Sequence, residues 1–229
     1  GSAVVSPTVA SSYSITGSNA SGCIALSPAI VTVGMYSLPV ISVPSGSICQ
    51  GGSYTLSPSG AISYTYSSGS AVVSPLTSQT YSIIGTNVFG CLSPISATAN
   101  VVVNLTPTIS VNSGSVCAGT SFTMNPSGAS TYSYSSGTNV VNPSSNSTYS
   151  VLGTSVAGCV STLAAVSTVT VVSLPIISAS GGSICPGQSF TLSPSGASSY
   201  SYSSGSAVVS PTVASSYSIT GSNASGCIA

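Results

Sequence analysis

Apolar residues form short β-branched runs along this chain, and the runs are bounded by clusters of Gly, Pro, Ser and Asn. No stretch has apolar residues at helical spacing over enough length to predict a helix. Runs of this kind predict strands, and short strands between turn signals are typical of a small β-sandwich. In residues 37–104 the predicted strands are Val40–Val43, Ser53–Leu56, Ile62–Tyr66, Ala71–Val73, Thr80–Ile84 and Ala97–Val103.

The chain contains internal repeats, and the positions of its cysteines give their period. They stand at positions 23, 49, 91, 117, 159, 185 and 227, so the gaps alternate between 26 and 42, which sum to 68. Three such periods make 204 residues. Residues 1–25 recur letter for letter as residues 205–229, whereas sibling modules within the chain diverge. We expect a 204-residue unit in a longer array, of which the chain is a window; the alternative is a recent duplication inside one finite protein.

The period predicts a tandem array of small Ig-like β-sandwich modules, each of which contacts mainly its neighbours. Residues 1–36 correspond to the C-terminal part of a module, residues 37–104 and 105–172 to whole modules, and residues 173–229 to a module without its last strand. Prolines at positions 39, 107 and 175 stiffen the short joints between modules, since proline fixes φ. The expected array is rod-like.

A non-covalent assembly is a second way to complete the last module. A partner chain's Ile30–Tyr36 could supply the missing strand, as in strand-donation complexes. The partner would then bring its own residues 1–25 to compete with residues 205–229 for one place. Continuation of one covalent array is therefore the preferred interpretation.

The composition excludes most chemistry. Of 229 residues, none is Asp, Glu, Lys, Arg or His, and 42% are hydrophobic. General acid–base catalysis lacks its usual groups, and a serine nucleophile has no base to activate it. Without Lys or Arg the chain cannot neutralise nucleic-acid phosphates. Zinc is disfavoured because there is no CxxC pair and no His. We expect no enzyme, no cofactor, no metal and no nucleic-acid partner, and a net charge near zero favours self-association.

A membrane-spanning helix is not expected. The most apolar window, residues 24–43, contains Pro28, Pro39 and several serines between turn-rich neighbours.

Pairs of tyrosines two residues apart recur once per period, and each pair faces one side of its strand. Core packing is the favoured role, and the alternative is an exposed row of aromatic rings for stacking sugars. The pairs are Tyr64 with Tyr66, Tyr132 with Tyr134, and Tyr200 with Tyr202.

Several motifs together resemble the Ig-like repeats of Bacteroidetes-type secreted and cell-surface proteins. These are a Cys-x-Gly, the stretch SFTLSPSGA at 189–197, a Tyr-x-aromatic strand, TYSVLGT at 148–154, a Gly-Cys at 158–159 and a valine-rich closing strand. In that family the aromatic strand usually ends in Trp and the Gly-Cys turn often carries Asp. Here Tyr66, Tyr134 and Tyr202 replace the first, and Asn87 or Asn223 lies near the second.

Spacing alone permits cysteine pairing across either gap, and only the 42-residue gap lies inside one module of the family's kind. The resemblance therefore implies Cys49 with Cys91, Cys117 with Cys159, and Cys185 with Cys227, with Cys23 left for a partner upstream. Closing such a loop stabilises a domain by about 4 kcal/mol in the chain-entropy model. Disulfides imply an oxidising compartment, so we expect an extracellular or cell-surface protein.

Glycans are a further expectation. Asn-x-Ser/Thr sequons stand at Asn19, Asn104, Asn146 and Asn223, and the many Ser and Thr residues offer sites for O-linked sugars.

Two functions fit these observations. The first is the structural shaft of an extracellular filament built from tandem disulfide-bonded Ig-like modules and coated with glycans. The second is the stalk or carbohydrate-binding arm of a surface adhesin or of a secreted polysaccharide-degrading enzyme.

Overall fold

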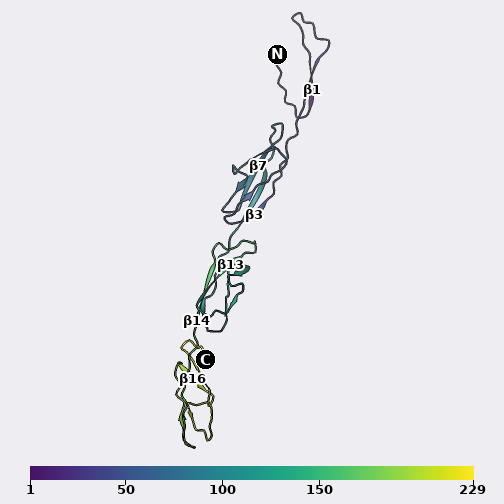
Figure 1. Ribbon diagram of the computed structural model, residues 1–229. Helices are drawn as coiled ribbons and strands as arrows, with labels where there is room; N and C mark the ends of the chain where they lie inside the picture. The colour runs from purple at the N-terminus through teal and green to yellow at the C-terminus, as the bar shows by residue number, and fades with distance from the viewer. The chain divides into compact units, whose positions relative to one another are not determined.

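The computed structural model describes all residues 1–229, and it contains strands but no helix (Figure 1). The expected all-β class with small Ig-like β-sandwich modules is confirmed. The chain divides into two compact units, residues 1–105 and 106–229. The module boundaries expected from the period stay a prediction, because this division cuts the chain once, after Leu105. No helix is present that could cross a membrane.

The first unit contains one complete sandwich. Its larger sheet has the strand order β3-β8-β7-β5, in which β3 runs parallel to β8 and the other neighbours are antiparallel. Its smaller sheet pairs β4 with β6. The strands are β3 (Gly46–Cys49), β4 (Tyr54–Thr55), β5 (Ser63–Tyr66), β6 (Val72–Val73), β7 (Gln79–Thr86) and β8 (Ala97–Asn104).

The core of this sandwich lies between the two sheets. Every second residue of β7 and β8 points inward, so Ile83 and Val101 are fully buried. Leu56 and Val73 close the core from the side of the smaller sheet. This alternation follows the two-residue period of a strand, and it explains why short runs such as Ala97–Asn104 suffice to build a module.

One strand was predicted in the wrong place. Val40–Val43 makes only an isolated bridge, Ser42 to Ser59, although Ile41 and Val43 pack against the core. The strand that joins the sheet is β3, whose Gly and Ser gave no strand signal. Gly46 is needed there because the Tyr54 ring lies where its Cβ would be. Close packing against an aromatic ring thus outweighed β-propensity.

The second unit repeats this sandwich after 68 residues. Its four-stranded sheet has the order β11-β13-β14-β9, again with one parallel pair, β14 with β9. Met124, Val141 and Val151 take the places of Leu56, Val73 and Ile83. The strands are β9 (Gly114–Cys117), β10 (Phe122–Thr123), β11 (Thr131–Tyr134), β12 (Val140–Val141), β13 (Ser147–Thr154) and β14 (Ala165–Val172).

Two parts of the chain are incomplete sandwiches. In residues 173–229 two pairs of strands form, β15 with β17 and β16 with β18, and nothing occupies the place that β14 takes one period earlier. In residues 1–36 only the hairpin of β1 and β2 forms. The strands are β15 (Phe190–Thr191), β16 (Ser199–Tyr202), β17 (Val208–Val209), β18 (Ile219–Ser222), β1 (Ser11–Ile15) and β2 (Ala29–Val33).

Two of the three tyrosine pairs pack into the cores, as predicted. Tyr64 and Tyr66 contact the first core, and Tyr132 and Tyr134 contact the second. The Tyr64 hydroxyl also donates to the Ala61 carbonyl (2.9 Å) and accepts from the Ala61 N–H (3.0 Å). The rings are therefore structural anchors rather than an exposed row for sugars.

Candidate functional site

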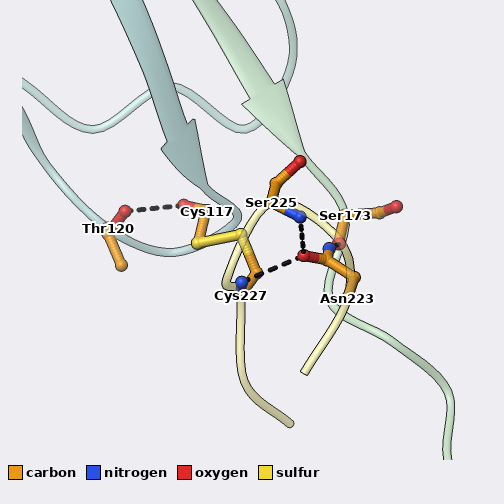
Figure 2. Close-up of a disulfide and its surroundings, with 6 residues drawn as sticks. All are labelled: Cys117, Thr120, Ser173, Asn223, Ser225 and Cys227. Atoms are coloured by element: carbon orange, nitrogen blue, oxygen red, sulfur yellow. Dashed lines mark hydrogen bonds between the residues drawn. A yellow bond between two sulfur atoms is a disulfide. The ribbon is translucent and has the colours of Figure 1, made fainter. Parts of the chain in front are cut away.

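A tight turn that ends in Gly-Cys follows each strand of the β7 type. In residues 223–227 the Asn223 side-chain oxygen accepts hydrogen bonds from the Ser225 and Cys227 N–H groups, both at 3.0 Å (Figure 2). Gly226 has a φ of +81°, which favours glycine because other residues strain there. We call residues 223–227 and their counterparts at 19–23, 87–91 and 155–159 the Gly-Cys turns.

The asparagine of the turn also holds the joint that leads into its own module. The Asn223 amide nitrogen donates to the Ser173 carbonyl at 2.8 Å, 50 residues earlier in the chain (Figure 2). Asn87 makes the same bond to the Ser37 carbonyl, also at 2.8 Å. One side chain thus fixes the turn through its oxygen and the linker through its nitrogen.

Aromatic contact adds to this attachment in the first unit. The rings of Tyr36 and Phe89 are stacked, with centroids 3.8 Å apart and planes at 10°. Tyr36 precedes the linker, and Phe89 lies in the Gly-Cys turn that holds it. The close parallel stacking adds dispersion contacts between the linker and the turn.

The disulfide of the second unit crosses the joint between two successive modules. Cys117 and Cys227 are bonded, with Cα atoms 5.6 Å apart and 110 residues between them in sequence. Cys117 lies at the end of β9 beside the last residue of β14, Val172, and Cys227 lies in the next module's Gly-Cys turn. Figure 2 shows this bond next to Ser173, so the linker and the disulfide join the same two modules side by side.

The predicted pairings Cys117 with Cys159 and Cys185 with Cys227 are wrong, because Cys117 is bonded to Cys227. Within a module the two cysteines lie at opposite ends of the last strand. Cys117 is beside Val172 at the end of β14, whereas the turn that holds Cys159 leads toward its beginning. Eight strand residues at about 3.3 Å each separate those ends by about 25 Å. A disulfide requires Cα atoms within about 7 Å.

The remaining cysteines fall into two groups. Cys49 and Cys159, which stand one period before Cys117 and Cys227, are also disulfide-bonded. Cys23 and Cys185 are exposed free thiols, and Cys91 is a half-buried one. The predicted bond between Cys49 and Cys91 is therefore wrong as well.

The side chains of the sequon residues Asn19, Asn146 and Asn223 make hydrogen bonds within the fold. Asn146 accepts a hydrogen bond from the Val171 N–H at 2.8 Å, and Asn19 accepts from the N–H groups of its own Gly-Cys turn. The Asn223 amide nitrogen, the atom that an N-glycan would be attached to, already donates to Ser173. Asn104 lies at the end of β8 and its carbonyl accepts from the Gln50 N–H at 2.8 Å. Glycosylation at these four residues stays a prediction.

No group of three or more potential metal-ligating side chains occurs in the structure. Four of the seven cysteines are disulfide-bonded, and the bond between Cys117 and Cys227 joins two successive modules. The chemistry that the arrangement offers is thiol oxidation across module joints.

The fold and these joints define a chain of tandem β-sandwich modules that are cross-linked to one another. No protein-family model and no curated protein matches the sequence. Among solved structures, an I-band fragment of titin, I67–I69, matches 83% of this chain and 95% of its own at 13% identity and a TM-score of 0.40. A 1.5-MDa bacterial ice-binding adhesin matches 84% of this chain and 95% of its own at 15% identity and a TM-score of 0.34.

A third solved structure is a Ca²⁺-stabilised ice-binding adhesin of an Antarctic bacterium. It matches 75% of this chain and 60% of its own at 14% identity and a TM-score of 0.35. The modules of the present chain are defined by their own strands and cores.

Proposed function

We propose that the chain forms the shaft of an extracellular filament, a tandem array of Ig-like modules of the Bacteroidetes surface-protein type. The observation that carries this proposal is the disulfide between Cys117 and Cys227. A bond inside one module would stabilise that module alone, whereas a bond between two modules also transmits tension past their linker. Such a connection is of use to a protein whose task is mechanical.

The linkers support the same function. A lone Ser-Leu-Pro segment would leave one covalent connection about which two modules could swivel. At Ser173 the disulfide and the bond from Asn223 add two further connections. Three attachments at one joint restrict the bending and twisting of one module against the next. A filament needs this stiffness, whereas a catalytic or ligand-binding module does not.

Continuation of the 204-residue unit head to tail, glycans on the surface and an extracellular location complete the proposal. The disulfides require an oxidising compartment, which supports the location. The alternative function, a sugar-binding arm, would need a repeated row of exposed aromatic rings, and two of the three repeated tyrosine pairs are packed against the cores. A stalk that leads to a terminal adhesive domain differs from a filament in the sequence that follows residue 229.

Tandem mass spectrometry of the native material tests continuation of the array. The chain has no Lys or Arg, so digestion uses chymotrypsin, followed by removal of sugars. We expect a peptide that runs from within residues 205–229 directly into residues 26–35. Peptides that instead lead from residue 229 into unrelated sequence would support a stalk and overturn the filament.

Single-molecule extension of the 229-residue chain tests the mechanical role. The disulfide removes about 110 residues from the extensible length, which is about 360–400 Å at full extension. We expect the total gain in contour length on unfolding to increase by at least that amount when reductant is added. An unchanged gain would show that tension does not pass through the bond.

A further inference from the structure

The last part of the chain has an open side where the complete modules have a strand. In residues 105–172, β14 lies between β13 and β9. In residues 173–229, β18 pairs only with β16, and Gly182–Cys185, the counterpart of β9, forms no strand. The strand that pairs in parallel with β9 has no counterpart there, so residues 182–185 have no neighbour in the sheet and form no strand either.

The open side exposes the interior of the sandwich. Leu192 is half-buried, whereas its counterparts Leu56 and Met124 are 2% and 0% exposed. A groove of about 320 Å³ lies along this side, and its lining includes Phe190, Leu192, Val209, Tyr217 and Ile219. The equivalents of Ile219 in the complete modules, Ile83 and Val151, are both fully buried, whereas Ile219 is only half-buried.

The chain also contains a strand with the matching pattern and no core to bury it. β2 stands 68 residues before β8 and 136 before β14, so Val31 and Val33 occupy the positions of Ala99 and Val101. Ala99 and Val101 are fully buried, whereas Val31 is 47% exposed. β2 pairs with β1 in the same register that β14 adopts with β13, as Tyr13 with Val31 and Tyr149 with Ser167 show.

Two free thiols stand at complementary places. The observed bond joins the first cysteine of a module to the second cysteine of the next module, 110 residues later. Adding 110 to 185 gives 295, and subtracting the 204-residue unit gives 91. Cys185 and Cys91 are both free. Cys23 occupies the same position of the 204-residue unit as Cys227, so its partner is the Cys117 of the preceding unit. Pairing over 110 residues therefore gives every cysteine of a repeating array a partner.

We propose that residues 29–36 of the following 204-residue unit fill the groove in residues 173–229, and that Cys185 then bonds to Cys91 of that following unit. In the array residues 205–229 are also residues 1–25 of the following unit, so the filling strand belongs to the same covalent chain. The strand completes the larger sheet, with Val33 opposite Ser215 and Ala29 opposite Ile219. Gly182–Cys185 then pairs in parallel with it and places Cys185 beside Tyr36. This inference depends on the proposed array, and it names the surface and the covalent bond by which its repeats are joined.

Bond formation is a two-electron oxidation. The thiols of Cys185 and Cys91 lose two protons and two electrons, and one S–S bond forms between them. A small-molecule disulfide such as oxidised glutathione supplies the oxidising equivalents: its own S–S bond breaks, and it takes up the two electrons and two protons to give two thiols.

The test uses a chain in which residues 1–204 are followed directly by residues 1–229. After oxidation with a glutathione redox pair, the protein is digested with chymotrypsin without reduction, and cross-linked peptides are identified by mass spectrometry. We expect Cys185 of the first repeat linked to Cys91 of the second. A link from Cys185 to any other cysteine, or a free Cys185, would overturn the predicted bond.

Hydrogen exchange on the same chain tests the strand separately from the bond. The N–H groups of residues 182–185 in the first repeat should exchange at least about tenfold more slowly than in the 229-residue chain. Val31→Asn with Val33→Asn in the second repeat should abolish this protection, and the same pair in the first repeat should leave it unchanged. Equal exchange in the presence and absence of the second repeat would overturn the groove as the docking site.

The two experiments can fail separately from the test of the proposed function. The bond and the protection can be found in the two-repeat chain even if the native material lacks a peptide that joins residue 229 to residue 26. Conversely, such a peptide with Cys185 bonded elsewhere would support the array and contradict the proposed joint.

Discussion

Residues 105–172 and 173–229 have closely similar sequences through their first five strands, yet only the former closes its core. Val169 on β14 is fully buried in the first, and no residue fills its place in the second. The consequence extends beyond the missing strand: the counterpart of β9 is unpaired and Leu192 is partly open to solvent. The comparison shows that the last strand organises the module, because it supports one sheet neighbour and covers the core at once.

The largest expected effect concerns the bond between these two regions. Replacing Cys117 and Cys227 by Ser should lower the free energy of unfolding of residues 106–229 by about 4–5 kcal/mol, as the chain-entropy model gives for a loop of about 100 residues. Urea denaturation followed by tyrosine fluorescence measures the change. The control, Cys91→Ser with Cys185→Ser, removes two free thiols and should change stability by less than about 0.5 kcal/mol. Equal losses in both variants would mean that the bond adds nothing.

The difference between closed and open cores gives the second prediction. Met124→Ala should destabilise its module by about 3 kcal/mol, because the side chain is fully buried and its removal leaves a cavity. Leu192→Ala at the equivalent position should cost less than half of that, since Leu192 is only half-buried. Thermal and urea unfolding of the two variants, compared with the parent chain, decide the point. Equal costs would show that the open side is not open in solution.

A smaller effect is expected at the turns. Asn223→Ala removes two hydrogen bonds within the Gly-Cys turn and one to Ser173, so it should cost about 1–2 kcal/mol. Asn223→Ser is the matched variant, because Ser155 occupies this position in the second complete module and its hydroxyl accepts from the Cys159 N–H at 3.2 Å. It should recover part of the loss. If both variants cost the same, the asparagine acts on the linker alone.

The smallest effect should follow a change in pH or salt. The chain contains no carboxylate, ammonium, guanidinium or imidazole side chain, so no side chain is expected to titrate between about pH 4 and 7. Both kinds of module should therefore keep their unfolding midpoints within experimental error across that interval and from about 0.05 to 1 M sodium chloride. A clear acid transition measured by circular dichroism would contradict this.

The sequence predicted the fold well where apolar alternation decides the structure. β5, β7 and β8 lie close to their expected positions because each has inward residues two apart, such as Ile83 or Val101. β3 was missed because its Gly46 is required by the neighbouring Tyr54 ring, a contact that no local pattern reveals. The period of 68, obtained from the cysteines, recurs in the starts of β5, β11 and β16.

The candidate site was predicted only in part. Asn87, Asn223 and the cysteines were recognised, but their partners were not. The asparagines bind carbonyls 50 residues earlier, and Cys117 bonds to a cysteine 110 residues later. The spacing between adjacent motifs does not indicate these long sequence separations. The pairing failed because two cysteines within one module were assumed to be neighbours in space. The length of β14 and the position of β9 beside its end were the missing information.

The bond between Cys117 and Cys227 also constrains the order in which the protein matures. During synthesis Cys117 is followed by Cys159 and then by Cys185, and its true partner, Cys227, emerges only after both. A chain oxidised before it folds would bond Cys117 to whichever thiol came first. Once residues 105–172 have folded, β14 holds Cys159 about 25 Å away and removes it as a competitor. The folded module thereby excludes its own second cysteine, so β14 both closes the core and limits the choice of disulfide partner for Cys117.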